Sequence, residues 1–128
     1  MKAKVIETSI SKVWLDEEGI IREKIHAGSI VDLEVAKEEI GAYAVLCKYE
    51  ARPLLVDIRN VKSVTGEARS HLAGEEGAKV TCAVALLIGS PLSRIMGNFF
   101  LGLNKPSFPS KLFTSEEEAL IWLRGFLK

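Results

Sequence analysis

The sequence lacks an excess of charge of either sign, since its 128 residues hold 17 lysines and arginines against 17 aspartates and glutamates. A neutral chain has no electrostatic basis for general binding to nucleic acid or to an anionic membrane surface, so we expect neither as a partner. It also lacks the charge repulsion that keeps monomers apart, which favours an oligomer such as a homodimer. The hydrophobic fraction of 48% is ordinary for a globular protein and excludes a disordered one.

Long hydrophobic runs are absent too. The longest apolar stretch is far too short to span a bilayer. The N-terminus shows neither a long apolar region nor a cleavage site, so we expect no signal peptide and a cytoplasmic location. Only two cysteines occur, Cys47 and Cys82, and both have apolar neighbours in the sequence. Because a cysteine among apolar residues behaves as a small hydrophobe, we interpret both as buried thiols rather than as a disulfide.

The sequence does contain two continuous apolar runs, 53–58 and 80–88, each followed by a helix-starting turn and an amphipathic segment. Such runs are typical of strands that are buried on both faces, usually parallel strands joined by helical crossovers. Within the second run, Val84 and Leu86 alternate with Ala83 and Ala85, which places the small alanines on one face of the sheet.

Turn and capping signals predict the other elements. Three further strands are expected at 10–15, 20–26 and 108–113, the first two joined by a turn at Gly19. Four helices are expected, each preceded by a side chain that can cap it: Asp32, Thr65, Ser90 and Ser115. The predicted fold is a single α/β domain spanning residues 1–128, with the order ββαβαβαβα and a mostly parallel sheet. Right-handed crossovers would place most helices on one face, and a dimer partner is one candidate to cover the other.

Polar residues follow both long strands, at the edge of the sheet where α/β proteins place their sites. The first strand ends in Asp57 and is followed by Arg59, Asn60, Ser63 and Thr65; the second is followed by Gly89, Ser90, Ser93 and Arg94. Together they could form a polar patch that holds an anion at the helix N-termini. The simpler interpretation is that Asp57 binds loop amides while Thr65 and Ser90 cap helices, and it accounts for these residue types fully.

Signatures of catalysis are missing. The segment 89–94 lacks the spaced glycines and the Lys-Ser/Thr pair of a phosphate loop, and it is not a dinucleotide-binding fingerprint. No catalytic triad can be assembled, so we predict a non-enzymatic protein with no cofactor and no metal. One alternative is a metal-dependent enzyme that uses Glu67, His71 and Glu75, which are spaced four apart on the predicted helix. A solvated, charged helix face is the favoured interpretation of these three.

The helix predicted after Ser90 has apolar residues at spacings of three and four, namely Leu92, Ile95, Met96, Phe99, Phe100 and Leu103. Core packing is the first interpretation of this stripe. The second is a contact surface, marked by Leu101 on the outer side. The third is a pocket lined by Met96, Phe99 and Phe100, which would make the chain a small binding protein for an apolar, lipid-like ligand.

The segment Leu55–Val61 leads into a helix start at 65–67, where the sequence reads Thr65, Gly66, Glu67. Together with the order of elements, this pattern resembles the STAS domain of anti-sigma-factor antagonists. The segments Leu55–Val61 and Gly97–Pro106 also resemble a small, largely uncharacterised bacterial family near that fold.

The resemblance implies a regulatory domain that binds a protein partner, which is a kinase for STAS domains. In those domains a serine at the start of the helix after the Asp-containing strand is phosphorylated, and the added charge breaks the complex. Here Gly66 or Glu67 stands about where that serine is expected, so the switch serine is missing, although two hydroxyls lie nearby in sequence. The predicted partner-binding residues are Asp57, Arg59, Asn60, Ser63, Thr65 and Glu67.

Overall fold

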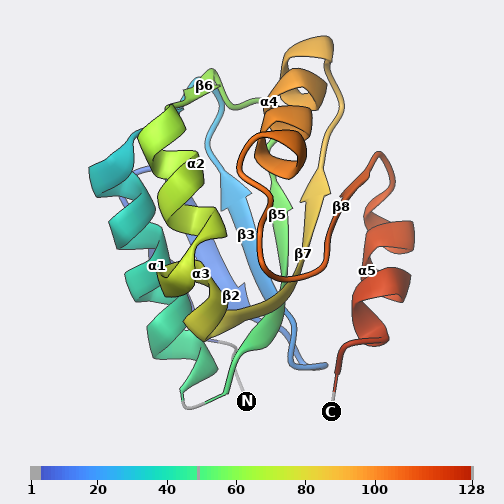
Figure 1. Cartoon of the computed structure of the whole chain (residues 1–128). Helices are drawn as coiled ribbons and strands as arrows, with labels where there is room; N and C mark the ends of the chain where they lie inside the picture. Colours follow the sequence, from blue (N-terminus) through green and yellow to red (C-terminus); the bar gives the residue numbers. More distant parts are fainter. Residues whose placement is uncertain (1–3, 49, 128) are drawn as a thin grey trace.

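The computed structural model describes residues 4–48 and 50–127 (Figure 1). Its main sheet has six strands in the order β1-β2-β3-β5-β7-β8. These are β1 (Val5–Glu7), β2 (Ser11–Leu15), β3 (Ile21–Ile25), β5 (Arg52–Asp57), β7 (Thr81–Leu87) and β8 (Ser110–Phe113). The pairs β1–β2 and β2–β3 are antiparallel, whereas β3–β5, β5–β7 and β7–β8 are parallel. The predicted α/β fold with a mostly parallel sheet is therefore confirmed.

Five helices in the described part of the chain pack on the two faces of this sheet. They are α1 (Leu33–Cys47), α2 (Gly66–Ala73), α3 (Glu75–Val80), α4 (Pro91–Gly102) and α5 (Glu116–Arg124). The first four share a hydrophobic core on one face, and α5 lies alone on the other (Figure 1). The suggestion of a dimer partner over the second face is wrong, because α5 covers it: Ala119 and Leu123 are fully buried there.

The four predicted caps all form. The side chains of Asp32, Thr65, Ser90 and Ser115 accept hydrogen bonds from the backbone N–H groups of Val35, Ala68, Ser93 and Glu118, respectively. Each cap satisfies an amide that the first helical turn leaves without a partner. The starts of these four helices were therefore predictable to within a residue or two.

The alternation in β5 and β7 divides the core between the two faces. Leu54, Val56, Val84 and Leu86 face the larger cluster beneath α1–α4. Leu55, Ala83, Ala85 and Leu87 face the smaller cluster beneath α5. The predicted division is confirmed from Ala83 to Leu87, and the small alanines lie where α5 packs against the sheet. It is wrong at the start of β7, where Cys82 lies beside Phe126 on the α5 side and Thr81 lines the other side.

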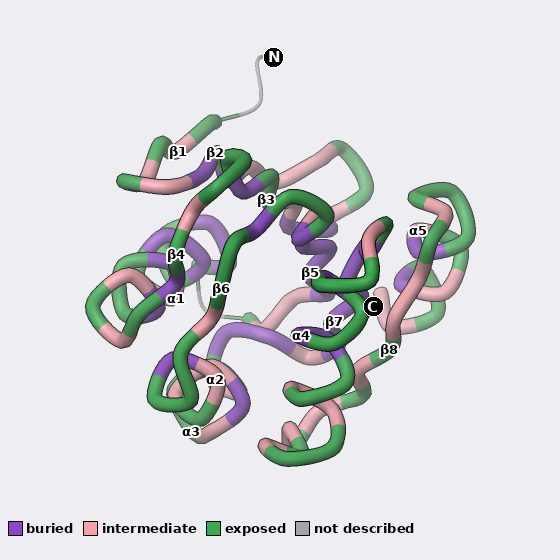
Figure 2. Tube along the Cα trace, turned by 90° about the horizontal axis from the view of Figure 1, so that it is seen from above, coloured by how far each residue is buried: buried purple, intermediate pink, exposed green. Residues whose placement is uncertain are grey.

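Several details differ from the prediction. The strand β1 was not expected, nor was the small parallel sheet formed by β4 (Ile30–Val31) and β6 (Ser63–Val64), which lie side by side in Figure 2. The first residue of the second apolar run is helical, because α3 extends to Val80 before β7 begins. The register of β5 against β7 also shifts between Arg52 and Pro53.

The two cysteines differ in burial. Cys47 is buried in α1, as predicted, but Cys82 is half-buried beside the register shift in β7. Its sulfur lies 4.0 Å from the carbonyl oxygen of Phe126, at the end of the chain that follows α5. The expectation of a fully buried thiol is thus met at Cys47 and wrong at Cys82.

Candidate partner-binding surface

The two strand ends that were predicted to meet do so. The hydroxyl of Ser90, which caps α4, donates to the carbonyl oxygen of Arg59 after β5, at 3.3 Å. The aliphatic part of the Arg59 side chain also lies against Gly89, where a Cβ atom would be only 3.1 Å from it. The loop after β5 and the start of α4 therefore form one continuous stretch of surface.

At the start of this stretch, Asp57 and Arg59 bind each other. The Arg59 side chain donates from Nε to Oδ1 at 3.0 Å and from Nη2 to Oδ2 at 2.8 Å, and its backbone N–H donates to Oδ1 at 3.1 Å. Burial alone would raise the pKa of Asp57, but the hydrogen bonds and the charge of Arg59 outweigh it and lower that pKa. Asp57 is thus an ionised residue that orders its own loop, as the simpler interpretation predicted.

The loop after Arg59 is held against residues 28–31 of the same chain by backbone hydrogen bonds. The carbonyl of Asn60 accepts from the N–H of Gly28 at 2.8 Å, and Ser63 pairs with Ile30 in the β4–β6 ladder. Both Asn60 and Ser63 are exposed residues. Thr65 and Glu67, at the start of α2, are exposed as well. All six predicted partner-binding residues therefore lie along one edge of the molecule.

The helix N-termini at this edge do not form an open anion site. The hydroxyl of Ser93, which is fully buried, accepts from the N–H groups of Gly89 and Ser90 at 3.0 and 2.9 Å. Ser90 in turn accepts from the N–H of Ser93. Because side chains already satisfy these amides, capping explains the serines, and the anion-binding alternative loses its geometric basis.

The three residues of the alternative metal site do not come together. Gly74 ends α2, and Glu75 begins the separate helix α3, so Glu67, His71 and Glu75 do not share one helix face. Across residues 4–48 and 50–127, no cluster of three histidine, cysteine, aspartate or glutamate side chains could hold a metal ion. The spacing of four would bring the three side chains together only if α2 continued past Gly74.

The apolar stripe of α4 is the least expected feature of this surface. Core packing was its first interpretation, yet Leu92, Ile95, Phe99 and Leu103 are between 45% and 69% exposed. Their spacing places them on one side of the helix. Only Met96 and Phe100, from the predicted stripe, pack into the core beneath. A group of large apolar side chains on one exposed helix face is typical of an interaction site, whereas single exposed apolar residues are common on any surface.

Arg69 joins this stripe to α2. Its guanidinium group lies 5.4 Å from the centre of the Phe99 ring, and its Nε donates to the side-chain oxygen of Asn104 at 3.0 Å. Asn104, just beyond α4, donates to the hydroxyl of Ser70 on α2 at 3.1 Å. We call this region the α2–α4 surface and define it by the following residues: Arg59, Asn60, Glu67, Arg69, Leu92, Ile95, Phe99 and Leu103.

Charges around the stripe are mostly basic. The helix α4 contains one charged residue, the exposed Arg94, and no acidic residue, and Lys105 follows its C-terminal end. Arg69 adds a third positive charge beside Phe99. Helical spacing places Arg94 on the side of α4 away from the stripe. The cation that contacts the exposed apolar side chains is therefore Arg69, with Lys105 just beyond the helix and Glu67 as the acid at the start of α2.

Comparison with known proteins identifies the family of the chain. A family model described as "Domain of unknown function (DUF7793)" matches residues 13–127. The chain belongs to this family. A comparison with proteins of curated function gives no match.

Solved structures resemble this family member in fold. An uncharacterized protein of the DUF3478 family with a SpoIIAA-like fold, from Shewanella loihica PV-4, is 14% identical with a TM-score of 0.56, covering 95% of this chain and 92% of that one. An anti-sigma factor antagonist from Mycobacterium paratuberculosis is 17% identical with a TM-score of 0.56, covering 96% and 93%. The unphosphorylated anti-sigma factor antagonist SpoIIAA is 13% identical with a TM-score of 0.51, covering 97% and 99%. The STAS-like fold that the resemblance implied is confirmed.

The predicted pocket is present in part in this member of the family. A cavity of about 80 Å³ lies between the sheet and α1, α2 and α4, and Met96 and Phe100 line it. Phe99 does not, because it points outward beneath Arg69. No helix in the described part of the chain is long and apolar enough to cross a membrane.

Sequence reasoning missed two buried acids beside that cavity. Glu39 is placed three residues after Ala36 and four before Tyr43, so helical spacing alone puts it on the buried face of α1. Glu23 alternates with Ile21 and Ile25, both buried, in β3. The positional signal was present for each, but their charge argued for solvent.

Proposed function

We propose that the chain is a non-enzymatic protein-interaction domain of the STAS-like type and that its α2–α4 surface binds a protein partner. The exposed apolar stripe of α4 is the observation that carries this proposal. It adjoins the residues that the resemblance to STAS domains pointed to, since Arg59 contacts the start of α4 and Arg69 holds α2 against Phe99. A rigid surface with an apolar centre and a polar rim is the usual anatomy of a protein interface.

The charge of the rim favours a particular kind of partner. Arg69 lies against Phe99, Lys105 follows the end of α4, and α4 itself carries no acid. A second copy of the chain would bring the same cations against one another in a symmetric contact. We therefore propose a different protein as the occupant, one whose contact segment is apolar and flanked by acidic side chains.

Regulation by a phosphorylated serine at the start of α2 is not part of this proposal. Gly66 and Glu67 occupy that region, and the nearby hydroxyl of Thr65 accepts a hydrogen bond from Ala68 as a helix cap. The exposed carboxylate of Glu67 gives the surface a fixed negative charge at this end. Intact mass measurement of the chain from its own host tests this point, and a stoichiometric phosphate on Ser63 or Thr65 would contradict it.

A matched pair of substitutions tests the partner surface. Ile95 on α4 and Ile121 on α5 are 50% and 58% exposed, so Ile95→Asp and Ile121→Asp make the same change on opposite faces of the sheet. Wild-type and variant chains, each confirmed to be folded, are used to capture the partner from host extract, and the complex is then rebuilt from purified proteins. We expect Ile95→Asp to weaken the rebuilt complex by at least about tenfold and Ile121→Asp to leave it unchanged.

Two outcomes would overturn the proposal. One is a partner that binds Ile95→Asp as tightly as wild type. The other is equal loss of binding in both variants, which would indicate that any added charge disturbs the chain. The mass of each purified chain in solution tests the identity of the occupant, because a wild-type dimer that Ile95→Asp separates would show that a second copy covers α4.

A further inference from the structure

The cavity beneath α1, α2 and α4 is mostly apolar. Its walls come from three central strands and from the helices above them, and they include Ile25, Leu54, Val56, Val84, Leu86 and Met96. Its volume of about 80 Å³ is roughly half that of an engineered apolar cavity that binds benzene. A molecule of about five non-hydrogen atoms matches this space, whereas a long-chain lipid does not.

One acidic side chain lines this apolar space. Glu39 is only 2% exposed, and its Oε1 atom has no hydrogen-bond partner among the described residues. A buried polar atom without a partner destabilises the fold, so native proteins seldom retain one without a use. Tyr43, Thr81 and Arg69 also line the cavity, but among the buried side-chain nitrogen and oxygen atoms of its described lining residues, Oε1 alone lacks a partner.

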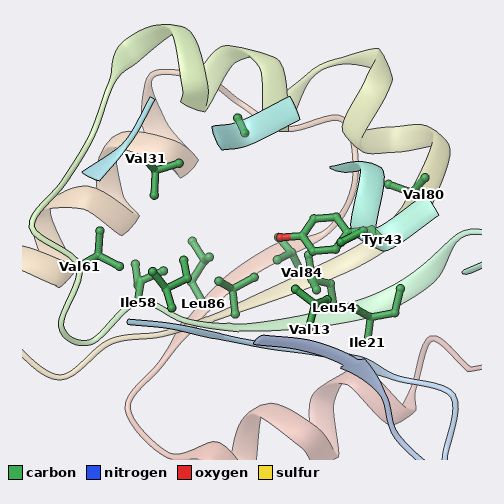
Figure 3. Close-up of a cluster of buried hydrophobic side chains, with 14 of the residues drawn as sticks. Val13, Ile21, Val31, Tyr43, Leu54, Ile58, Val61, Val80, Val84 and Leu86 are labelled. Atoms are coloured by element: carbon green, nitrogen blue, oxygen red, sulfur yellow. The ribbon is translucent and has the colours of Figure 1, made fainter. Parts of the chain in front are cut away.

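The neighbours of Glu39 explain why its Oε1 remains available. Glu23, on β3, accepts from the hydroxyl of Ser11 at 2.8 Å and from the hydroxyl of Tyr43, which Figure 3 shows pointing into the space between sheet and helices. Burial, then the charge of Glu23 and a hydrogen bond between the two side chains, raises the pKa of Glu39 well above the ordinary value. Glu39 is therefore neutral in the folded chain, and its Oε1 accepts no hydrogen bond from the described residues.

The cavity also has a wall that reaches the surface. Arg69, Leu72, Phe100 and Phe108 line it and are only half-buried, unlike the strand residues opposite. These four come from α2, from α4 and from the segment that follows α4. A small molecule would reach Glu39 by passing between them, with no opening of the sheet.

We propose that this cavity is a binding site for a small molecule with a compact apolar body and a single N–H or O–H donor that bonds Oε1 of Glu39. The apolar walls would hold the body, and the one unpaired acceptor would set its orientation. Discrimination of this kind is strong when a site leaves a buried polar group unpaired with the wrong ligand. The site shares Arg69 with the α2–α4 surface but lies beneath it, and neither proposal requires the other.

Two isomeric probes separate this site from an ordinary packing void. Isobutanol and isopropyl methyl ether have the same atoms and nearly the same shape, but only the alcohol donates a hydrogen bond. Each is titrated into the whole chain while backbone amide resonances are followed by NMR. We expect saturable shifts for residues around the cavity, with isobutanol bound at least about tenfold more tightly than the ether.

Two variants test whether the preference for isobutanol depends on Glu39 and whether both probes bind in the cavity. Glu39→Leu removes the acceptor, so we expect the alcohol to lose its advantage over the ether. Leu72→Trp, which leaves Glu39 unchanged and fills the half-buried wall, should abolish binding of both probes while the spectrum remains that of a folded chain. Equal affinity of the two probes for the wild type would overturn the proposal. So would no binding of isobutanol up to about 100 mM, which would mean that a water molecule alone serves Oε1.

Discussion

The guanidinium group of Arg69 lies 5.4 Å from the centre of the Phe99 ring, so a residue of α2 covers an aromatic side chain of α4. The same guanidinium donates from Nη1 to the carbonyl oxygen of Val64 at 2.8 Å and from Nε to Asn104 at 3.0 Å. Arg69 thus joins three segments that the sequence separates by up to 35 positions. It fixes the position of α2 relative to the exposed stripe.

Replacement of Arg69 tests this junction. We expect Arg69→Ala to lower the free energy of unfolding by about 1–2 kcal/mol, because two hydrogen bonds and a cation–π contact are lost. Arg69→Lys should recover little of that loss, since one ammonium cannot reproduce the planar fork of the guanidinium. Urea unfolding of the three chains measures both values. A lysine variant as stable as wild type would contradict the assigned role.

Two glycines offer opposite outcomes for the same substitution. A Cβ at Gly77 in α3 would lie 1.9 Å from the carbonyl oxygen of Leu72, whereas one at Gly41 in α1 would meet nothing within 4 Å. We expect Gly77→Ala to destabilise the chain by about 2–3 kcal/mol. Gly41→Ala should stabilise it by about 0.5–1 kcal/mol, because alanine loses less backbone entropy in a helix. Thermal unfolding compares them, and destabilisation by both would show that the packing of α1 is misplaced.

Helix α5 alone covers the second face of the sheet, and replacement of one buried leucine tests how much this packing contributes to stability. Leu123 is fully buried against that face, so Leu123→Ala should cost about 2–5 kcal/mol. The same change at Leu92, half-exposed on α4, should alter stability by no more than about 0.5 kcal/mol. Denaturant unfolding distinguishes the two sites. Similar losses at both positions would mean that Leu92 is covered in solution.

The buried acid on α1 predicts a pH dependence of stability. Burial, then the charge and hydrogen bond of Glu23, and then the charge of Glu38 raise the pKa of Glu39 well above 4.5. The folded chain therefore binds a proton that the unfolded chain releases at pH values between 4.5 and the folded pKa. Across that window the free energy of unfolding falls as pH rises, and above it the loss is complete.

The variant Glu39→Gln cannot titrate, so its stability relative to wild type should increase as pH rises from about 4.5. Urea unfolding at a series of pH values gives the two curves. Tyr43, whose pKa burial raises further, stays neutral and does not interfere in this range. Parallel curves for the two chains would show that the folded environment does not protonate Glu39.

Local rules of sequence predicted the elements well. The caps at Asp32, Thr65, Ser90 and Ser115 act within one turn of the chain, and the apolar runs of β5 and β7 specify strands wherever they pack. Gly74 ends α2, and the short helix α3 that follows it was not predicted. Its formation depends on close backbone packing at Gly77, which no local pattern reveals.

The candidate sites were harder to predict because they depend on which face each helix presents. The stripe of α4 has ideal core spacing, yet the helix packs through Met96 and Gly97, the latter close to Leu112 of β8. That choice of face is set by the sheet rather than by α4. Similarly, Glu39 lies beside Glu23, from a strand 16 residues earlier in the sequence, and no local pattern reveals that the two acids meet.

Amide hydrogen exchange of the chain, free and bound to the captured partner, tests the central claim most directly. We expect binding to slow exchange in α4 (Pro91–Gly102) and in the first turn of α2, and to leave α5 (Glu116–Arg124) unaffected. Slowed exchange confined to α5 or to the outer face of α1, with α4 unchanged, would contradict the assignment of the α2–α4 surface.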